Sequence, residues 1–166
     1  MNVVITLPKD LIKAIIAGEK FFEIRSKVPS HFDERCDVVF VVEKYTKKVP
    51  IYFTIQTFCH FSRVEDITFL AKKAAVSTDF MEKYWAEKRT IYAWVIGCAC
   101  KVSYPDGLYS DLKICKNPQS FIYRDFQWRK IHFKSHVWLN KPTFFIPTVE
   151  YKRYYRCLSM QKGGTL

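Results

Sequence analysis

The spacing of apolar residues changes twice within the first 25 positions and predicts three elements. Residues 3–8 (VVITLP) are apolar and β-branched, which is typical of a short strand that ends at the proline. From residue 9 the apolar positions recur at i, i+1, i+4 and i+5, as in a helix that buries one stripe. Gly18 is the natural stop of that helix. Residues 21–25 (FFEIR) then predict a second strand.

Between residue 26 and residue 107, apolar runs alternate with polar breaks. An unbroken apolar run predicts a strand that is buried on both faces. Ser62 with Glu65 three residues later fits a helix capping box. In the helix after it, Phe80, Tyr84 and Trp85 form the expected buried stripe. The expected elements are a loop at 28–36, strands at 37–43, 51–61 and 90–104, helices at 62–74 and 77–88, and a turn at 105–107.

Many strands and few helices indicate an α+β fold. We expect a small mixed β-barrel decorated by about three helices, rather than a doubly wound parallel sheet. Asn117-Pro118 predicts a turn. From about residue 129, basic and aromatic residues alternate and prolines exclude a long helix, so that short strands or a wrapping segment are expected there.

Charge is distributed unevenly over the 166 residues, whose formal net charge is +11. Residues 1–112 hold 16 Lys or Arg and 14 Asp or Glu, whereas residues 113–166 hold 11 and 2. This basic excess favours contact with a polyanion, most simply a nucleic acid. The alternative is a solvated basic surface. Aromatic residues within the basic stretch could stack on bases or could complete the barrel.

Composition also argues against membrane, secreted and zinc-binding proteins. The sequence has no apolar run of about 18 residues and no signal-like N-terminus, so we expect a cytoplasmic protein without membrane contact. The six cysteines form no C-x-x-C pair, and the four histidines add no zinc spacing. We therefore expect reduced cysteines that pack in the fold, with no metal and no cofactor.

Three ionisable residues, Lys20, Glu23 and Arg25, crowd the start of the second strand. Lys20 follows the glycine turn, where side chains reach a barrel rim, while Glu23 and Arg25 share one strand face. A partly desolvated lysine could act as a base or nucleophile, and a charged one could contact phosphate. Arginine could hold a phosphate or stack on a base. The structural alternative is a set of ion pairs that stabilises the barrel mouth.

These residues carry a family resemblance. Gly18-x-Lys20-x-x-Glu23-x-Arg25, directly after the first helix, resembles the defining motif of ASCH domains, which belong to the PUA-like superfamily of small β-barrels. The stretch FMEKYWAEKRTIYAWVI resembles the helix, lysine-rich turn and final strand of that family, and NPQSFIY resembles the ending of short microbial and phage members. The resemblance implies an ASCH domain at 1–124, followed by a basic aromatic extension at 125–166 packed on the barrel.

The resemblance also implies a function that involves nucleic acid. Members of the family that this chain resembles are thought to bind RNA or nucleotides in a cleft beside this motif. Some members resemble ribonucleases, and one branch resembles amidohydrolases of N4-acylated cytidine that use a lysine, a threonine and a glutamate. Lys20 matches that lysine, Glu23 replaces the threonine, and Glu82 is the nearest match to the glutamate.

Three functional hypotheses follow. The leading one is a protein that binds RNA or single-stranded nucleic acid and recognises a nucleotide in the cleft. The second is a metal-independent ribonuclease or N4-acylcytidine amidohydrolase with Lys20, Glu23 and Glu82 as catalytic residues. The third is a phage or host protein-interaction module. The expected nucleic-acid contacts are Lys20, Glu23, Arg25, Gln119, Ser120, Tyr123, Lys130, Lys134, Lys152, Arg153 and Arg156.

Overall fold

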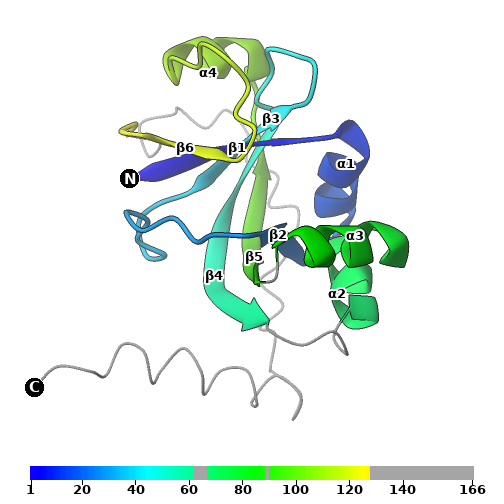
Figure 1. Ribbon diagram of the computed structural model, residues 1–166. Coiled ribbons are helices and arrows are strands. Elements are labelled where there is room, and N and C mark those ends of the chain that lie inside the picture. Colours follow the sequence, from blue (N-terminus) through cyan, green and yellow to red (C-terminus); the bar gives the residue numbers. More distant parts are fainter. Residues whose placement is uncertain (62–66, 89, 128–166) are drawn as a thin grey trace, which may run out of the picture.

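A computed structural model describes residues 1–61, 67–88 and 90–127. The described residues form an α+β fold with one six-stranded mixed sheet in the order β2-β5-β4-β3-β1-β6 (Figure 1). The strands are β1 (Asn2–Leu7), β2 (Phe22–Arg25), β3 (Val39–Glu43), β4 (Ile51–Phe61), β5 (Ile91–Lys101) and β6 (Phe121–Arg124). The helices are α1 (Lys9–Ala17), α2 (Ile67–Ala74), α3 (Thr78–Lys88) and α4 (Pro105–Asp111).

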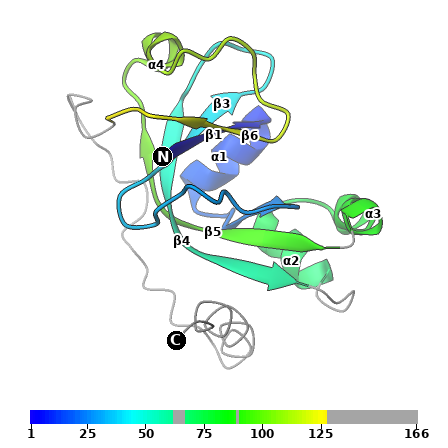
Figure 2. The same ribbon diagram turned by 60° about the vertical axis from the view of Figure 1, so that its left-hand side comes forward.

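The sheet is mixed because β1 and β3 pair in parallel, while the other four strand pairs are antiparallel. The two long strands β4 and β5 slip in register at Phe53/Ile55 and again at Ile55/Thr57, and irregularities of this kind bend a sheet (Figure 2). Gly97 is required at this bend, since an added Cβ would lie 2.5 Å from the hydroxyl oxygen of Thr54.

The predicted α+β class and mixed sheet are confirmed. Within the described residues, β2 and β6 are the two edges of the sheet and do not pair with each other. A side chain links β2 to the segment before β6, because Nη1 of Arg25 donates to the carbonyl of Ser120 at 3.2 Å. Among the described residues, the two edge regions are therefore linked by this side-chain hydrogen bond and not by strand pairing.

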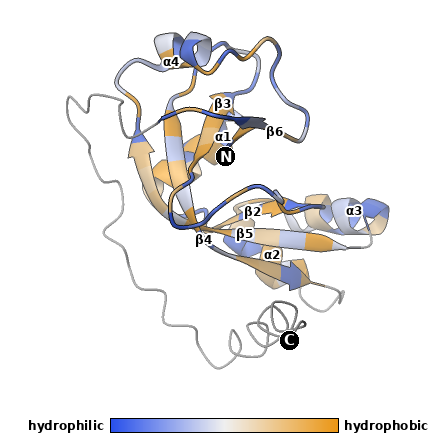
Figure 3. Cartoon of the chain, turned by 90° about the vertical axis from the view of Figure 1, so that its left-hand side faces the viewer, coloured by the Kyte–Doolittle hydropathy of each residue, from blue (hydrophilic) through white to orange (hydrophobic). Residues whose placement is uncertain are grey.

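The first helix and its stop are also confirmed. Gly18 has a φ of 74°, and its N–H caps the end of α1. Ile12 and Ile15 form the buried stripe of α1 against the sheet. Figure 3 shows hydrophobic residues concentrated in the strands, and more polar residues on α4 and the connecting loops.

Two local predictions are wrong. The segment Pro-Asp-Gly at 105–107 was expected to be a turn, but it begins α4, because proline is well suited to the first helical position. Phe80 was expected in the buried stripe of the second helix, but it is 54% exposed. Met81 and Trp85 are the buried side chains of α3. The capping box at Ser62 and the tail from 128 lie outside the described residues.

Among the described residues, no helix combines the length and the apolar character that crossing a membrane requires. The five described cysteines are free thiols. Only part of the packing expectation holds, because Cys36 and Cys115 are exposed while Cys59 and Cys100 are buried.

Thiol labelling should follow this burial. Burial raises the pKa of Cys59 to about 11, so this residue carries almost no thiolate at pH 8. We expect iodoacetamide to modify exposed Cys115 quickly and Cys59 only after denaturation, as measured by peptide mass spectrometry. Labelling in urea provides the control, in which the two rates should converge. Equal labelling of both residues in the native protein would contradict the packing of β4.

Candidate functional site

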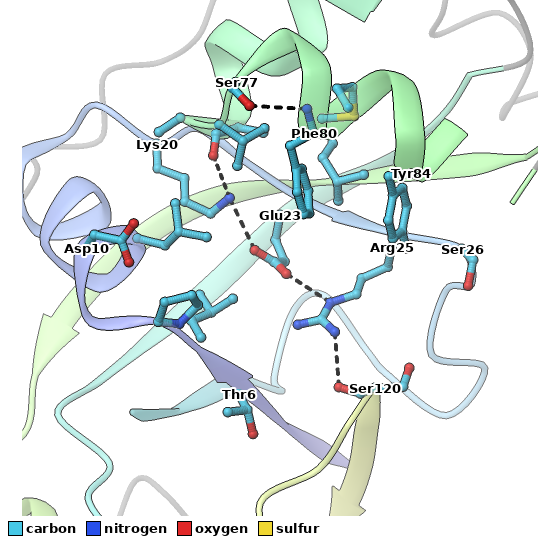
Figure 4. Close-up of a pocket in the computed structure, with 18 of the residues that line it drawn as sticks. Thr6, Asp10, Lys20, Glu23, Arg25, Ser26, Ser77, Phe80, Tyr84 and Ser120 are labelled. Carbon is cyan, nitrogen blue, oxygen red and sulfur yellow. Dashed lines mark hydrogen bonds and ion pairs between the residues drawn. The ribbon is translucent and has the colours of Figure 1, made fainter. Parts of the chain in front are cut away.

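A cavity of about 810 Å³ opens where four parts of the chain meet (Figure 4). Its walls come from the end of β1 with the start of α1, from β2, from the α2–α3 region and from the segment before β6. Lys20, Glu23 and Arg25 all line it. The structure thus brings the charged residues of the sequence motif together at one cavity.

The turn after α1 positions Lys20. The backbone N–H groups of Glu19 and Lys20 both donate to the carbonyl of Ala14, so the chain reverses tightly after Gly18. The next residues enter β2, which pairs with β5 and places Glu23 opposite Trp94. The spacing of the motif therefore reflects its place in the fold: α1 ends at Gly18, and the chain enters the edge strand β2 only a few residues later.

Lys20 is almost completely buried, with 2% of its side chain exposed. Its Nζ lies 2.7 Å from the carbonyl of Phe22, 2.8 Å from the carbonyl of Ala74 and 3.3 Å from Oε2 of Glu23. An ammonium group has three N–H donors, and three acceptors surround this one. Burial lowers the pKa of Lys20, and the carboxylate of Glu23 opposes that shift.

Glu23 links two cations. Its side chain is 5% exposed, and while Oε2 faces Lys20, Oε1 lies 2.9 Å from Nε of Arg25. The contact with Nε is an ion pair without hydrogen-bond alignment. Arg25 then donates from Nη1 to the carbonyl of Ser120. The network runs from α2 through β2 to the segment before β6 and carries one net positive charge.

Two aromatic rings from α3 flank this network in the cavity wall. The rings of Phe80 and Tyr84 stack at a centroid distance of 6.2 Å and an interplanar angle of 17° (Figure 4). Both residues line the cavity, with Lys88 one turn beyond Tyr84 on α3. Burial raises the pKa of Tyr84, so its hydroxyl stays neutral at physiological pH. The cavity thus offers aromatic surface beside the N–H donors of Arg25.

Solved structures share this fold. The tyrosine-to-phenylalanine variant of an ASCH protein from Zymomonas mobilis superposes with a TM-score of 0.61 and 17% identity, over 75% of this chain and 90% of that one. A serine-to-alanine variant of the same protein gives a TM-score of 0.61 and 16% identity, over 75% and 88%. The ASCH structure without substitution gives 0.59 and 17%, over 75% and 87%.

The chain has the fold of an ASCH domain. The structural neighbours bear out the resemblance at the level of the fold. No protein-family model matches the sequence, and no curated protein sequence matches it. At 17% identity, what the chain shares with these structures is the arrangement of strands and helices.

Within this ASCH fold, the predicted site residues separate into three groups. Gln119 and Ser120 line the cavity with the motif residues. Tyr123 does not line the cavity. Its side chain reaches the loop before β3 instead, where its hydroxyl accepts a hydrogen bond from the backbone N–H of His31. Glu82 is exposed on α3 and does not line the cavity either. Lys130, Lys134, Lys152, Arg153 and Arg156 lie outside the described residues.

The fold also brings to the cavity three polar residues that the sequence pattern did not identify. Thr6, Asp10 and Ser77 line the cavity. The hydroxyl of Thr6 is buried and has no hydrogen-bond partner among the described residues. No sequence signal marks Thr6, since it sits inside an ordinary β-branched strand. The exposure of Phe80 likewise follows from the packing of α3 against α2 and not from its spacing in the sequence.

Proposed function

We propose that this protein binds single-stranded nucleic acid, RNA in the first instance, and holds one nucleotide in the cavity beside Lys20, Glu23 and Arg25. The observation that carries the proposal is the pairing of an aromatic surface, formed by exposed Phe80 and half-buried Tyr84, with a partly buried arginine that is already held in position. Aromatic faces stack on unpaired bases, and arginine donates to phosphate or base oxygens. A volume of about 810 Å³ lies within the range usual for small-ligand sites.

The network supports binding by holding Arg25 in place before a ligand arrives. Glu23 and the carbonyl of Ser120 fix the guanidinium from two directions. A side chain that is already ordered loses less conformational entropy when it binds. The guanidinium has further N–H donors, and charge-assisted hydrogen bonds to phosphate are stronger than neutral ones.

The same geometry favours binding over the hydrolase alternatives. A lysine that acts as a base or nucleophile needs a free lone pair. The Nζ of Lys20 contacts three acceptors, which matches the protonated amine. Glu82, the third residue of the hydrolase hypothesis, is exposed outside the cavity. The contacts of Lys20 therefore support a structural role for it beneath a binding site.

Replacing Arg25 by alanine is expected to weaken binding of a labelled single-stranded RNA by about 10- to 100-fold, because charge-assisted hydrogen bonds are lost. Fluorescence anisotropy of the full chain measures this. Arg35→Ala, in an exposed loop away from the cavity, is the matched control and should bind like the wild type. Phe80→Ala removes an exposed ring and should weaken binding without loss of folding.

The same samples separate the alternatives. Equal affinity of Arg25→Ala, Phe80→Ala and the wild type would contradict binding in the cavity. A parallel single-stranded DNA of the same sequence tests the preference for RNA. Denaturing gels of the incubated RNA report cleavage, and cleavage that disappears in Arg25→Ala would favour the ribonuclease hypothesis instead.

A further inference from the structure

The turn that joins β3 to β4, residues 43–48, displays an aromatic ring on a well-braced backbone. Its two ends are joined where the N–H of Glu43 donates to the carbonyl of Lys48 at 3.0 Å. Thr46 closes a tighter turn inside it, since both its N–H and its hydroxyl donate to the carbonyl of Glu43. Asn117 braces the turn from outside by donating to the carbonyl of Thr46.

Tyr45 stands at the position of this turn where a tyrosine is least expected. Its φ is 66°, a left-handed conformation that glycine or asparagine usually supplies at the third residue of a turn. Its side chain is 88% exposed, so the ring contributes little to the core. Nζ of Lys44 lies 4.7 Å from the ring centroid. A strained, exposed aromatic residue points to a use for the ring other than stability.

The charge around Tyr45 is predominantly positive. Lys44, Lys47 and Lys48 are exposed on the turn itself, and within the described part of the chain only Lys48 of these three approaches a carboxylate, that of Asp106 at 3.8 Å. Lys113 and Lys116 are exposed on the segment that ends at the bracing residue Asn117. Lysine is depleted in protein–protein interfaces, whereas lysines beside an exposed ring are suited to a nucleic-acid backbone with unpaired bases.

The turn is also structurally continuous with the cavity. Leu7 lines the cavity, its carbonyl accepts from the N–H of Lys44, and its register partner across the sheet is Glu43. On the other side, the segment that contains Asn117 runs directly into Gln119 and Ser120 at the cavity. Figure 1 shows the turn as the cyan loop beyond β3, next to α4.

We propose that turn 43–48 is a second contact site for the bound strand. Tyr45 stacks on a base that flanks the nucleotide in the cavity, and the lysines of the turn neutralise the phosphates between the two. This inference rests on the proposed function and extends it from one nucleotide to a strand of several. It predicts that affinity rises with oligonucleotide length and that the gain depends on the ring of Tyr45.

The test compares two probes and three forms of the full chain. The probes are a labelled single-stranded RNA of about 12 nucleotides and unlabelled nucleoside monophosphates. The forms are the wild type, Tyr45→Gly and Tyr45→Phe. Glycine suits the left-handed position, so Tyr45→Gly should melt at the same or a higher temperature than the wild type. It should still bind the long RNA about 10-fold more weakly, because a stacking contact is lost.

Each outcome decides the inference. Unchanged monophosphate binding by Tyr45→Gly, with long-RNA affinity retained by Tyr45→Phe, supports stacking at the turn. Full long-RNA affinity in Tyr45→Gly, while Arg25→Ala is weakened, overturns the inference and leaves the proposed function intact. A wild type that binds neither probe overturns both. Parallel loss of melting temperature and of binding to both probes in Tyr45→Gly assigns the ring a structural role and also overturns the inference.

Discussion

Replacing Lys20 by methionine is expected to lower the free energy of unfolding by about 3–5 kcal/mol, because it removes one member of a buried ion pair. The substitution removes the ammonium that donates to the carbonyls of Phe22 and Ala74 and that pairs with Glu23, whose other ion pair is with Arg25. Since Phe22 lies in β2 and Ala74 ends α2, the lysine also joins the helix to the sheet edge. Urea denaturation followed by circular dichroism measures the change.

Lys13→Met is the matched control, because Lys13 is exposed on α1 and should change stability by no more than about 0.5 kcal/mol. A Lys20→Met variant as stable as this control would show that the buried ammonium does not support the fold. The size of the expected effect also matters for functional work. Loss of activity in a Lys20 variant cannot by itself identify a catalytic lysine, so the exposed ring of Phe80 is a cleaner probe of the cavity than Lys20 or its network partner Arg25.

Binding of single-stranded RNA is expected to weaken steeply with salt, because each neutralised phosphate releases counterions. Besides the buried Lys20, which is paired with Glu23, the described residues offer two cations at the cavity, Arg25 and Lys88, and three lysines on turn 43–48. If each contacts one phosphate, the slope of log affinity against log salt is about −3.5, and affinity falls about 100-fold between 50 and 200 mM. Anisotropy titrations at four salt concentrations measure the slope.

The salt slopes of single lysine variants show which lysines contact phosphate. Lys47→Gln should reduce the slope by about 0.7 if Lys47 contacts a phosphate, whereas Lys13→Gln on the exposed face of α1 should leave it unchanged. Contacts from residues 128–166 would make the slope steeper. Affinity that stays flat across this range of salt would exclude a polyanion as the principal ligand and would favour the protein-interaction hypothesis.

Much of the site was predictable from local sequence because its core lies in six consecutive residues. Gly18 ends the helix, β2 follows at once, and the period of the strand puts Glu23 and Arg25 on one face. The contacts that give these residues their character come from elsewhere in the chain. The carbonyl of Ala74 comes from α2 and that of Ser120 from the segment before β6, and no local pattern announces either.

Burial and exposure were the least predictable properties. Helical spacing placed Phe80 in the core, but α3 packs on α2 through Met81 and Trp85, and Phe80 faces the cavity. Tyr123 followed a recognisable motif yet contacts the 26–36 loop, because β6 pairs with β1 in a register that directs it there. The direction of a side chain on an edge strand depends on which strand it pairs with and in which register, and neither can be predicted from the sequence of the edge strand alone.

The sequence alone was sufficient for the α+β class, the helix stop at Gly18, the charged motif and the uneven distribution of basic residues, because these depend on periodicity, turn chemistry and composition. Only the tertiary structure decided that Lys20 is buried among three acceptors, that Arg25 links β2 to the segment before β6, and that Phe80 and Tyr45 are exposed. Each of these depends on contacts between segments far apart in the chain. Long-range packing sets the environment of a charge, and local sequence does not.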